Sequence, residues 1–207
     1  MIGLMALATG LLLLGSCDDR PGYGGSTIVL AAEPESDLDF GVVAEFSLTE
    51  RSGELVTGES LAGAPYIASF FFTRCSGPCP ALLGNVRRLQ AELDEEASAV
   101  RLVSITVDPK NDTPEVLATH ADNFTADPKR WLFLTGTEDA IFRLMRNSFH
   151  MALEVLPDKD SVMGLQITHD TRLIVVDGAG HVRGYYDGKS QDEIDQALAR
   201  ARYLAGE

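Results

Sequence analysis

The chain has 207 residues, 45% of them hydrophobic, and a formal net charge of −14. The length fits one domain of ~100–200 residues, and the hydrophobic content argues against intrinsic disorder. The chain has 31 acidic and 17 basic residues. This balance excludes a nucleic-acid backbone as partner, because such a partner requires a basic face. The three cysteines are too few for a disulfide scaffold and cannot all pair with one another.

The first 16 residues are predicted to be a signal peptide of the lipoprotein type. Residues 2–14 carry no charge, and their ~20 Å of helix is shorter than the ~30 Å hydrocarbon core of a membrane. The sequence LGSC at 14–17 resembles the bacterial lipobox, whose cysteine becomes lipidated. We therefore expect Cys17 to anchor the chain in the membrane on the periplasmic side of a bacterial cell envelope, where disulfides can form. A plain secretory signal or a membrane anchor, with an incidental cysteine in either case, is the alternative.

Residues 17–37 are predicted to be the lipidated anchor and a flexible tether, because Gly, Pro, Ser and Asp are frequent there. Residues 38–207 are predicted to form one folded domain. Within it, residues 42–48 and 54–57 predict a hairpin. The nearly unbroken apolar run at 65–73 is typical of a central strand that is buried on both faces.

Helices and strands are then predicted to alternate. Apolar residues at helical spacing predict a helix over 79–97, which a strand at 100–107 follows. Asp112 and Glu115 resemble a capping box at the start of the next helix, with Pro114 in its first turn. The remaining predicted elements are a strand at 131–134, a helix at 138–147, a hairpin formed by 172–176 and 181–186, and a helix at 190–204. This order predicts an α/β layered domain with a mixed sheet.

Cys75 and Cys79 follow the predicted buried strand and open the predicted helix. Their spacing in a first helical turn would place both side chains on one face. Because a helix N-terminus favours negative charge, we expect one or both thiols to have a lowered pKa. Such a pair can act as a redox couple or hold a soft metal such as Cu(I). A purely structural pair, either a static disulfide or two buried free thiols, is the alternative. A static disulfide is less attractive, since it would close too small a loop to add much stability.

A third metal ligand would normally be a histidine, and the chain has four. His120 lies among polar residues of a predicted helix and is expected to face solvent, and His181 lies just after a hairpin turn. His169 directly precedes a predicted strand, at the kind of strand end where sites gather in α/β sheets. Position alone therefore makes His169 the first candidate and His150, in an irregular segment, the second.

Four segments in order resemble the Sco/SenC family of thioredoxin-like proteins. FFTRCSGPCP at 71–80 is similar to the family's C-x-x-x-C-P motif, and SITVDPKNDTPE at 104–115 is similar to its S-x-x-x-D-P-x-x-D-T-P-E motif. WLFLTG at 131–136 and ITH at 167–169 also match. The resemblance covers about residues 40–204. It implies a thioredoxin-like three-layer sandwich with a mixed central sheet and an N-terminal β-hairpin.

The resemblance further implies that Cys75, Cys79 and His169 bind copper as Cu(I) or Cu(II). The family's usual role is to deliver copper to the CuA centre of cytochrome c oxidase, and it is also credited with reducing the target's cysteines. Another cuproprotein is an alternative recipient. Ser76-Gly77-Pro78 departs from the many members that carry an acidic residue just before the second cysteine, so a charge is missing beside the site. Asp108 is a weaker candidate, either as a ligand or as a partner of the ligands.

Two functions remain open from the residues. The first is a metallochaperone, which binds and transfers copper without turnover of its own. The second is a thiol-disulfide oxidoreductase, in which Cys75 attacks a target disulfide, Cys79 resolves the mixed disulfide and a separate reductant restores the pair. His169 would then affect protonation instead of binding metal. A thiol peroxidase is a more distant third hypothesis.

Overall fold

The fold is described from a computed structural model, which describes residues 38–95, 98–151 and 171–207. These residues all belong to one compact unit, Glu33–Glu207. None of the helices in this part of the chain is both long enough and apolar enough to cross a membrane. The predicted signal peptide, the tether, Cys17 and His169 lie outside the described residues.

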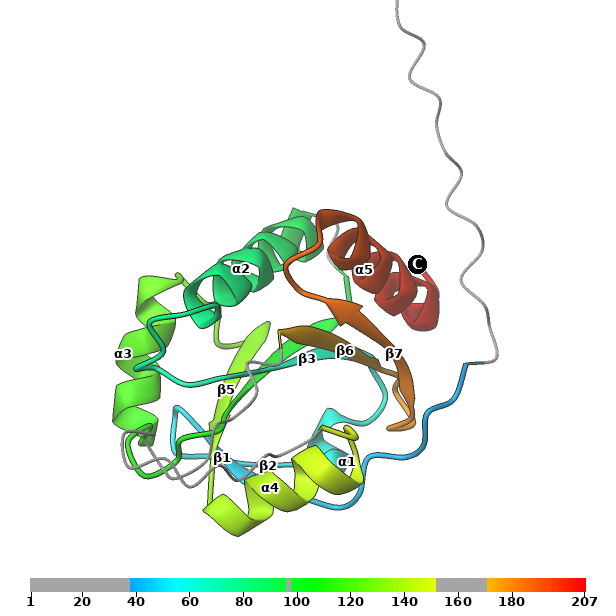
Figure 1. Cartoon of the computed structure of the whole chain (residues 1–207). Helices are drawn as coiled ribbons and strands as arrows, with labels where there is room; N and C mark the ends of the chain where they lie inside the picture. Colours follow the sequence, from blue (N-terminus) through cyan, green and yellow to red (C-terminus); the bar gives the residue numbers. More distant parts are fainter. Residues whose placement is uncertain (1–37, 96–97, 152–170) are drawn as a thin grey trace, which may run out of the picture. The chain divides into compact units, whose positions relative to one another are not determined.

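One mixed sheet forms the centre of the domain (Figure 1). Its strand order is β2-β1-β5-β4-β3-β6-β7. The strands are β1 (Ser47–Glu50), β2 (Leu55–Thr57), β3 (Tyr66–Phe71), β4 (Arg101–Thr106), β5 (Trp131–Thr135), β6 (Arg172–Val176) and β7 (Val182–Asp187). Strands β3, β4 and β5 are parallel to one another, whereas the other neighbours pair antiparallel. The predicted mixed sheet and the N-terminal hairpin, β1 with β2, are confirmed.

Helices cover both faces of this sheet (Figure 1). The helices are α1 (Gly58–Leu61), α2 (Cys79–Glu95), α3 (Pro114–Asn123), α4 (Glu138–Asn147) and α5 (Gln191–Ala205). Residues of α2, α3 and α5 share one buried cluster with one side of the sheet. Residues of α1 and α4 share a second cluster with the other side. The predicted three-layer arrangement is therefore confirmed.

Strand β3 lies between the two clusters. Ile67 and Phe71 pack on the α2 side, whereas Ala68 and Phe70 pack on the α4 side. Successive side chains of a strand point to opposite faces. Because both faces of the sheet are covered at β3, all six of its residues are buried. This placement explains the nearly unbroken apolar run in the sequence, since β3 is an interior strand between β4 and β6.

The side chains of two serines and one tryptophan form a polar network in the part of the core that faces α2. The hydroxyls of Ser69 in β3 and Ser104 in β4 lie 2.8 Å apart. The indole Nε1 of Trp131 in β5 donates to Ser104 Oγ at 2.8 Å. None of the three residues is more than 1% exposed, so the two serines satisfy polar atoms that water cannot reach.

The structure differs from the sequence prediction at three places near these elements. Strand β1 begins at Ser47 and not at residue 42, because Val42 instead forms an isolated bridge with His181. The short helix α1 was not predicted. The N-cap of α3 is Thr113, whose side chain accepts from the Val116 amide, so the prediction that Asp112 caps this helix is wrong.

Candidate metal centre

The two cysteines lie together between β3 and α2. Cys75 is in the turn that follows β3, and its amide donates to the Phe72 carbonyl oxygen at 3.2 Å. Cys79 is the first residue of α2, so the prediction that both cysteines belong to one helical turn is wrong. Both are free thiols, each only 8% exposed, within the cluster on the α2 side. Their side chains are hydrogen-bonded to each other.

Burial raises the pKa of the Cys79 thiol, and its hydrogen bond with Cys75 raises that pKa further. The prediction of a lowered pKa is therefore wrong for Cys79. The helix N-terminus does favour a thiolate, but the loss of hydration on burial disfavours the charged form more strongly. Without a cation, Cys79 is a protonated thiol at neutral pH, and a metal that binds its sulfur must displace that proton.

Asp112 fixes the segment that leads to Cys75. The Thr73 amide donates to Asp112 Oδ2 at 3.1 Å, and the Thr73 hydroxyl donates to Oδ1. The Thr106 hydroxyl also donates to Oδ2. The Asp112 side chain is fully buried, and hydrogen bonds to a buried carboxylate are among the stronger ones in proteins. The residue predicted to cap a helix therefore joins β4 to the cysteine loop.

Asp108 holds the next residue of the same segment. Arg74 Nη2 lies 2.7 Å from Asp108 Oδ2, and the Asp108 side chain is 2% exposed whereas that of Arg74 is 48% exposed. Asn111 Nδ2 donates to both oxygens of this carboxylate. These contacts favour a role for Asp108 in positioning the loop. They favour this role more than the alternative one of a metal ligand. The acidic motif at 104–115 thus binds the two residues that directly precede Cys75.

The histidines that are described do not join the cysteines. His120 stacks on the ring of Phe71 at a centroid distance of 5.6 Å and packs edge-on against Phe124. Burial lowers the pKa of His120, and the side chain is half-buried, so the prediction that it faces solvent holds only in part. His150 Nε2 lies 3.1 Å from the Phe40 carbonyl oxygen. His181 is also occupied, since its Nδ1 lies 2.9 Å from an oxygen of Asp39.

Within residues 38–95, 98–151 and 171–207, no group of three or more His, Cys, Asp or Glu residues is arranged to hold a metal ion. Two sulfur ligands are thus in place, and His169 as the third ligand stays a prediction. An open hollow of about 400 Å³ begins at Thr73 and extends over α3 past Glu115 and His120. The sequence did not indicate this hollow, because it depends on the packing of α3 beside the cysteine loop.

A family model described as SCO1/SenC matches residues 35–204. The chain belongs to the SCO1/SenC family. The match spans both cysteines and the acidic motif, so the family that those motifs predicted is confirmed.

Solved structures of SCO1/SenC proteins share the fold. The structure that identified a disulfide switch in BsSco, a member of the Sco family of cytochrome c oxidase assembly proteins, is 30% identical, with a TM-score of 0.69 over 80% of this chain and 94% of that chain. A SCO1/SenC family lipoprotein from Bacillus anthracis is 29% identical, with a TM-score of 0.71 over 79% of this chain and 95% of that chain. The predicted thioredoxin-like fold of the family is therefore confirmed.

Copper is present in at least one structure with this fold. ScoI of Bradyrhizobium japonicum, solved with copper bound, is 24% identical, with a TM-score of 0.65 over 79% of this chain and 99% of that chain. At this identity the likeness concerns the SCO1/SenC fold alone.

Proposed function

We propose that this protein is a metallochaperone that holds copper with Cys75, Cys79 and His169. It passes the copper to a cuproprotein, namely cytochrome c oxidase at its CuA site. The observation that carries the proposal is the pair of buried, free and mutually hydrogen-bonded thiols at the end of β3. Thiolates are the ligands that the soft ion Cu(I) prefers, and a neutral imidazole is also a suitable ligand for copper. Family membership and the assembly role of BsSco support the recipient.

The protonation of the pair determines how copper enters and leaves. A Cu(I) ion that replaces the protons of both thiols releases two protons to solvent, so a lower pH favours release of the ion. Transfer requires only that ligands of the recipient replace the sulfurs one at a time. Oxidation of the pair removes two electrons and two protons and forms a disulfide, which is no longer a thiolate ligand. The metallochaperone function therefore requires that Cys75 and Cys79 are reduced.

Ser76, Gly77 and Pro78 separate the two cysteines and carry no charge. Asp108, an acidic residue that contacts the cysteine loop, is paired with Arg74. A site with two thiolates, one imidazole and no added carboxylate favours Cu(I) over harder cations.

We also propose that Cys17 carries a lipid and holds the domain at the membrane surface on the periplasmic side of the envelope. The lipobox-like sequence at 14–17 and the lipoprotein of the same family in Bacillus anthracis support this anchor. Expression of the chain in bacteria with radiolabelled palmitate tests it. Label is expected in the unaltered chain and absent from Cys17→Ser, and an equally labelled variant would contradict the anchor.

The ligand set is tested by titrating the reduced full-length chain with Cu(I) against a competing chelator and with Cu(II) in parallel. One copper per chain is expected, and Cys75→Ser and Cys79→Ser should each abolish tight binding. His169→Ala should weaken copper binding severely while Cys75 and Cys79 can still form a disulfide. His150→Asn is the matched control, since His150 has φ 47° and Asn tolerates this conformation. Unchanged affinity in His169→Ala would contradict the three-ligand site.

A second function, thiol-disulfide oxidoreductase, is favoured by the contact between the two free thiols. In this function Cys75 forms a mixed disulfide with the target, and Cys79 then displaces the target's second thiol. Two electrons and two protons pass from the pair to the target. Copper affinity too weak to withstand the competing chelator, combined with stoichiometric reduction of a model disulfide, would favour the oxidoreductase.

A further inference from the structure

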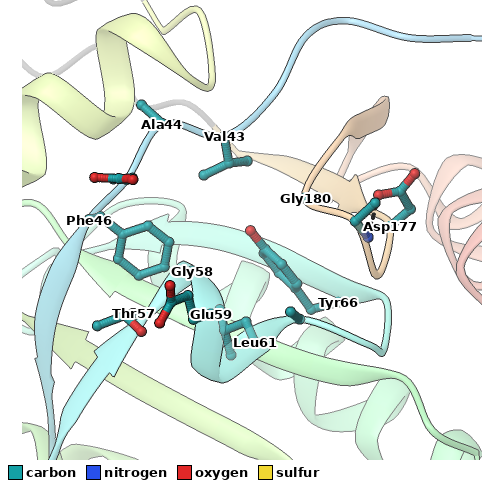
Figure 2. A pocket seen from close by; sticks show the side chains of 13 residues that line it. Val43, Ala44, Phe46, Thr57, Gly58, Glu59, Leu61, Tyr66, Asp177 and Gly180 are labelled. Atoms are coloured by element: carbon teal, nitrogen blue, oxygen red, sulfur yellow. Dashed lines mark hydrogen bonds between the residues drawn. The ribbon is translucent and has the colours of Figure 1, made fainter.

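A pocket of about 370 Å³ lies on the side of the sheet opposite the cysteines. Its walls are the segment 43–46, the start of α1 and the turn between β6 and β7 (Figure 2). Tyr66, the first residue of β3, forms part of the lining. Because β3 rises ~3.3 Å per residue, its two ends are roughly 17 Å apart. The pocket therefore lies apart from the copper site that follows the other end of β3.

Backbone hydrogen bonds between distant segments hold the pocket open. The Val43 amide donates to the Gly180 carbonyl oxygen at 2.8 Å, and the Gly63 amide donates to the Gly178 carbonyl oxygen at 2.8 Å. A Cβ at Gly178 would lie 3.0 Å from the carbonyl carbon of Gly63, so this close approach depends on glycine. A preformed pocket loses little conformational entropy when a ligand binds.

The hydroxyl of Tyr66 points into this pocket (Figure 2). Tyr66 is 5% exposed, and no residue of the described part of the chain hydrogen-bonds to its hydroxyl. Burial raises the pKa of Tyr66, so the group stays a neutral phenol whose oxygen has free lone pairs. Because this oxygen faces the pocket, it can accept a hydrogen bond from a donor of a bound ligand.

The rim of the pocket is negatively charged. Glu45 and Glu59 line it, and neither forms an ion pair with another described residue. Asp177 also lines the pocket, but its carboxylate is occupied by Arg183 at 2.7 Å and by the amides of Ala179 and His181. Two carboxylates that form no ion pair with another described residue thus line the same pocket as the aromatic ring of Phe46.

We propose that this pocket binds a small organic cation, namely a primary ammonium group on an apolar, ring-sized body. An ammonium has three N–H donors and no acceptor. The oxygens of Tyr66, Glu45 and Glu59 can accept hydrogen bonds from such donors. The apolar body packs against Val43, Phe46 and Leu61, which also line the pocket. The volume lies at the small end of the ~300–1,000 Å³ that is typical of ligand pockets. This inference does not depend on copper binding.

Benzylamine is the probe, titrated into the full-length chain by isothermal titration calorimetry. Benzyltrimethylammonium keeps the charge and the ring but lacks N–H donors, and it should bind about tenfold more weakly. Benzyl alcohol and benzoate should show no measurable binding. The double variant Glu45→Gln with Glu59→Gln should lose about tenfold in affinity or more. Glu54→Gln, an exposed carboxylate outside the pocket, is the matched control and should bind normally.

Tyr66→Phe removes only the oxygen and should weaken benzylamine about threefold to tenfold without loss of folding by circular dichroism. The Cys75→Ser, Cys79→Ser double variant should bind benzylamine normally, so failure of the copper proposal would leave this one intact. Equal affinity for benzyl alcohol, or no binding of benzylamine, would overturn the proposal. Tighter binding of a capped Gly-Lys-Gly peptide than of benzylamine would also overturn it, because the occupant would then be a lysine of a protein partner.

Discussion

Thr73 and Asp112 are 39 residues apart in the chain and are joined by two hydrogen bonds, one of them from the Thr73 amide at 3.1 Å. Thr73 lies two residues before Cys75, and Asp112 belongs to the second family motif. The contact therefore explains in physical terms why a segment that contains no sulfur accompanies the cysteine motif. It holds the cysteine loop against the end of β4.

Asp112→Asn is expected to reduce the free energy of unfolding by about 2–4 kcal/mol, because an amide nitrogen would face groups that are themselves donors. Chemical denaturation measures this loss. Copper affinity should also fall, because the loop that carries Cys75 loses its hydrogen bonds to Asp112. Asp122→Asn, an exposed acidic residue on α3, is the control and should change stability by no more than ~0.5 kcal/mol. Equal effects of both substitutions would contradict the role of Asp112.

Ser104→Ala is expected to cost about 1–3 kcal/mol of unfolding free energy, because it leaves the buried Trp131 N–H without a partner. Trp131 is the only tryptophan in the chain, so its fluorescence spectrum reports directly on this site. The emission maximum should shift in Ser104→Ala and stay constant in Ser47→Ala, whose serine is exposed on β1. A stable Ser104→Ala protein with unshifted emission would show that the network does not contribute.

The stability of the domain is expected to fall on acidification through His120. Burial holds its folded-state pKa below the 6.5 of a free histidine, so the unfolded state binds more protons between these two values. The contribution of neutral His120 is complete above pH 6.5 and decreases as the pH falls from there toward the folded-state pKa. NMR titration should place the pKa of His120 below 6.5. His120→Phe keeps a stacking ring and should flatten the acid limb of the stability profile, and a pKa of 6.5 or higher would contradict the burial argument.

Oxidation of the thiol pair by diamide is expected to abolish copper binding in proportion to the disulfide formed. The oxidant takes two electrons and two protons from Cys75 and Cys79, and dithiothreitol should restore both thiols and binding. Free thiols are counted with a chromogenic reagent alongside copper stoichiometry. Full copper binding by chains that have no reactive thiol would mean that sulfur is not the ligand.

The sequence predicted the fold closely where side-chain periodicity decides the structure. Helix α4 occupies the predicted residues 138–147, and the apolar run at 65–73 contains β3 with every residue buried. The errors concern contacts between distant segments. Asp112 and Thr113 are both suited to cap a helix, and only the distant Thr73 decides which of them does so.

The candidate site shows the same division. The order of motifs along the chain correctly predicted the family and the position of the cysteine pair between a strand and a helix. The pKa of Cys79 was predicted in the wrong direction, because the burial of this first residue of α2 depends on packing that local sequence does not show. For the same reason the sequence missed the stacking of His120 on Phe71 and the pocket at Tyr66, both of which join elements far apart in the chain.

The two cysteines are attached to the domain in unequal ways. Cys79 is part of a helix whose next turn carries Leu82 and Leu83, both almost fully buried, so moving its sulfur means lifting α2 from the core. Cys75 sits in a turn that is tethered through the side chains of its two predecessors. Cys79 is therefore held by the packing of a helix, whereas Cys75 is held by hydrogen bonds and an ion pair of a loop. A change of sulfur–sulfur separation, whether for a metal ion or for a disulfide, is therefore expected to need a smaller rearrangement at Cys75 than at Cys79.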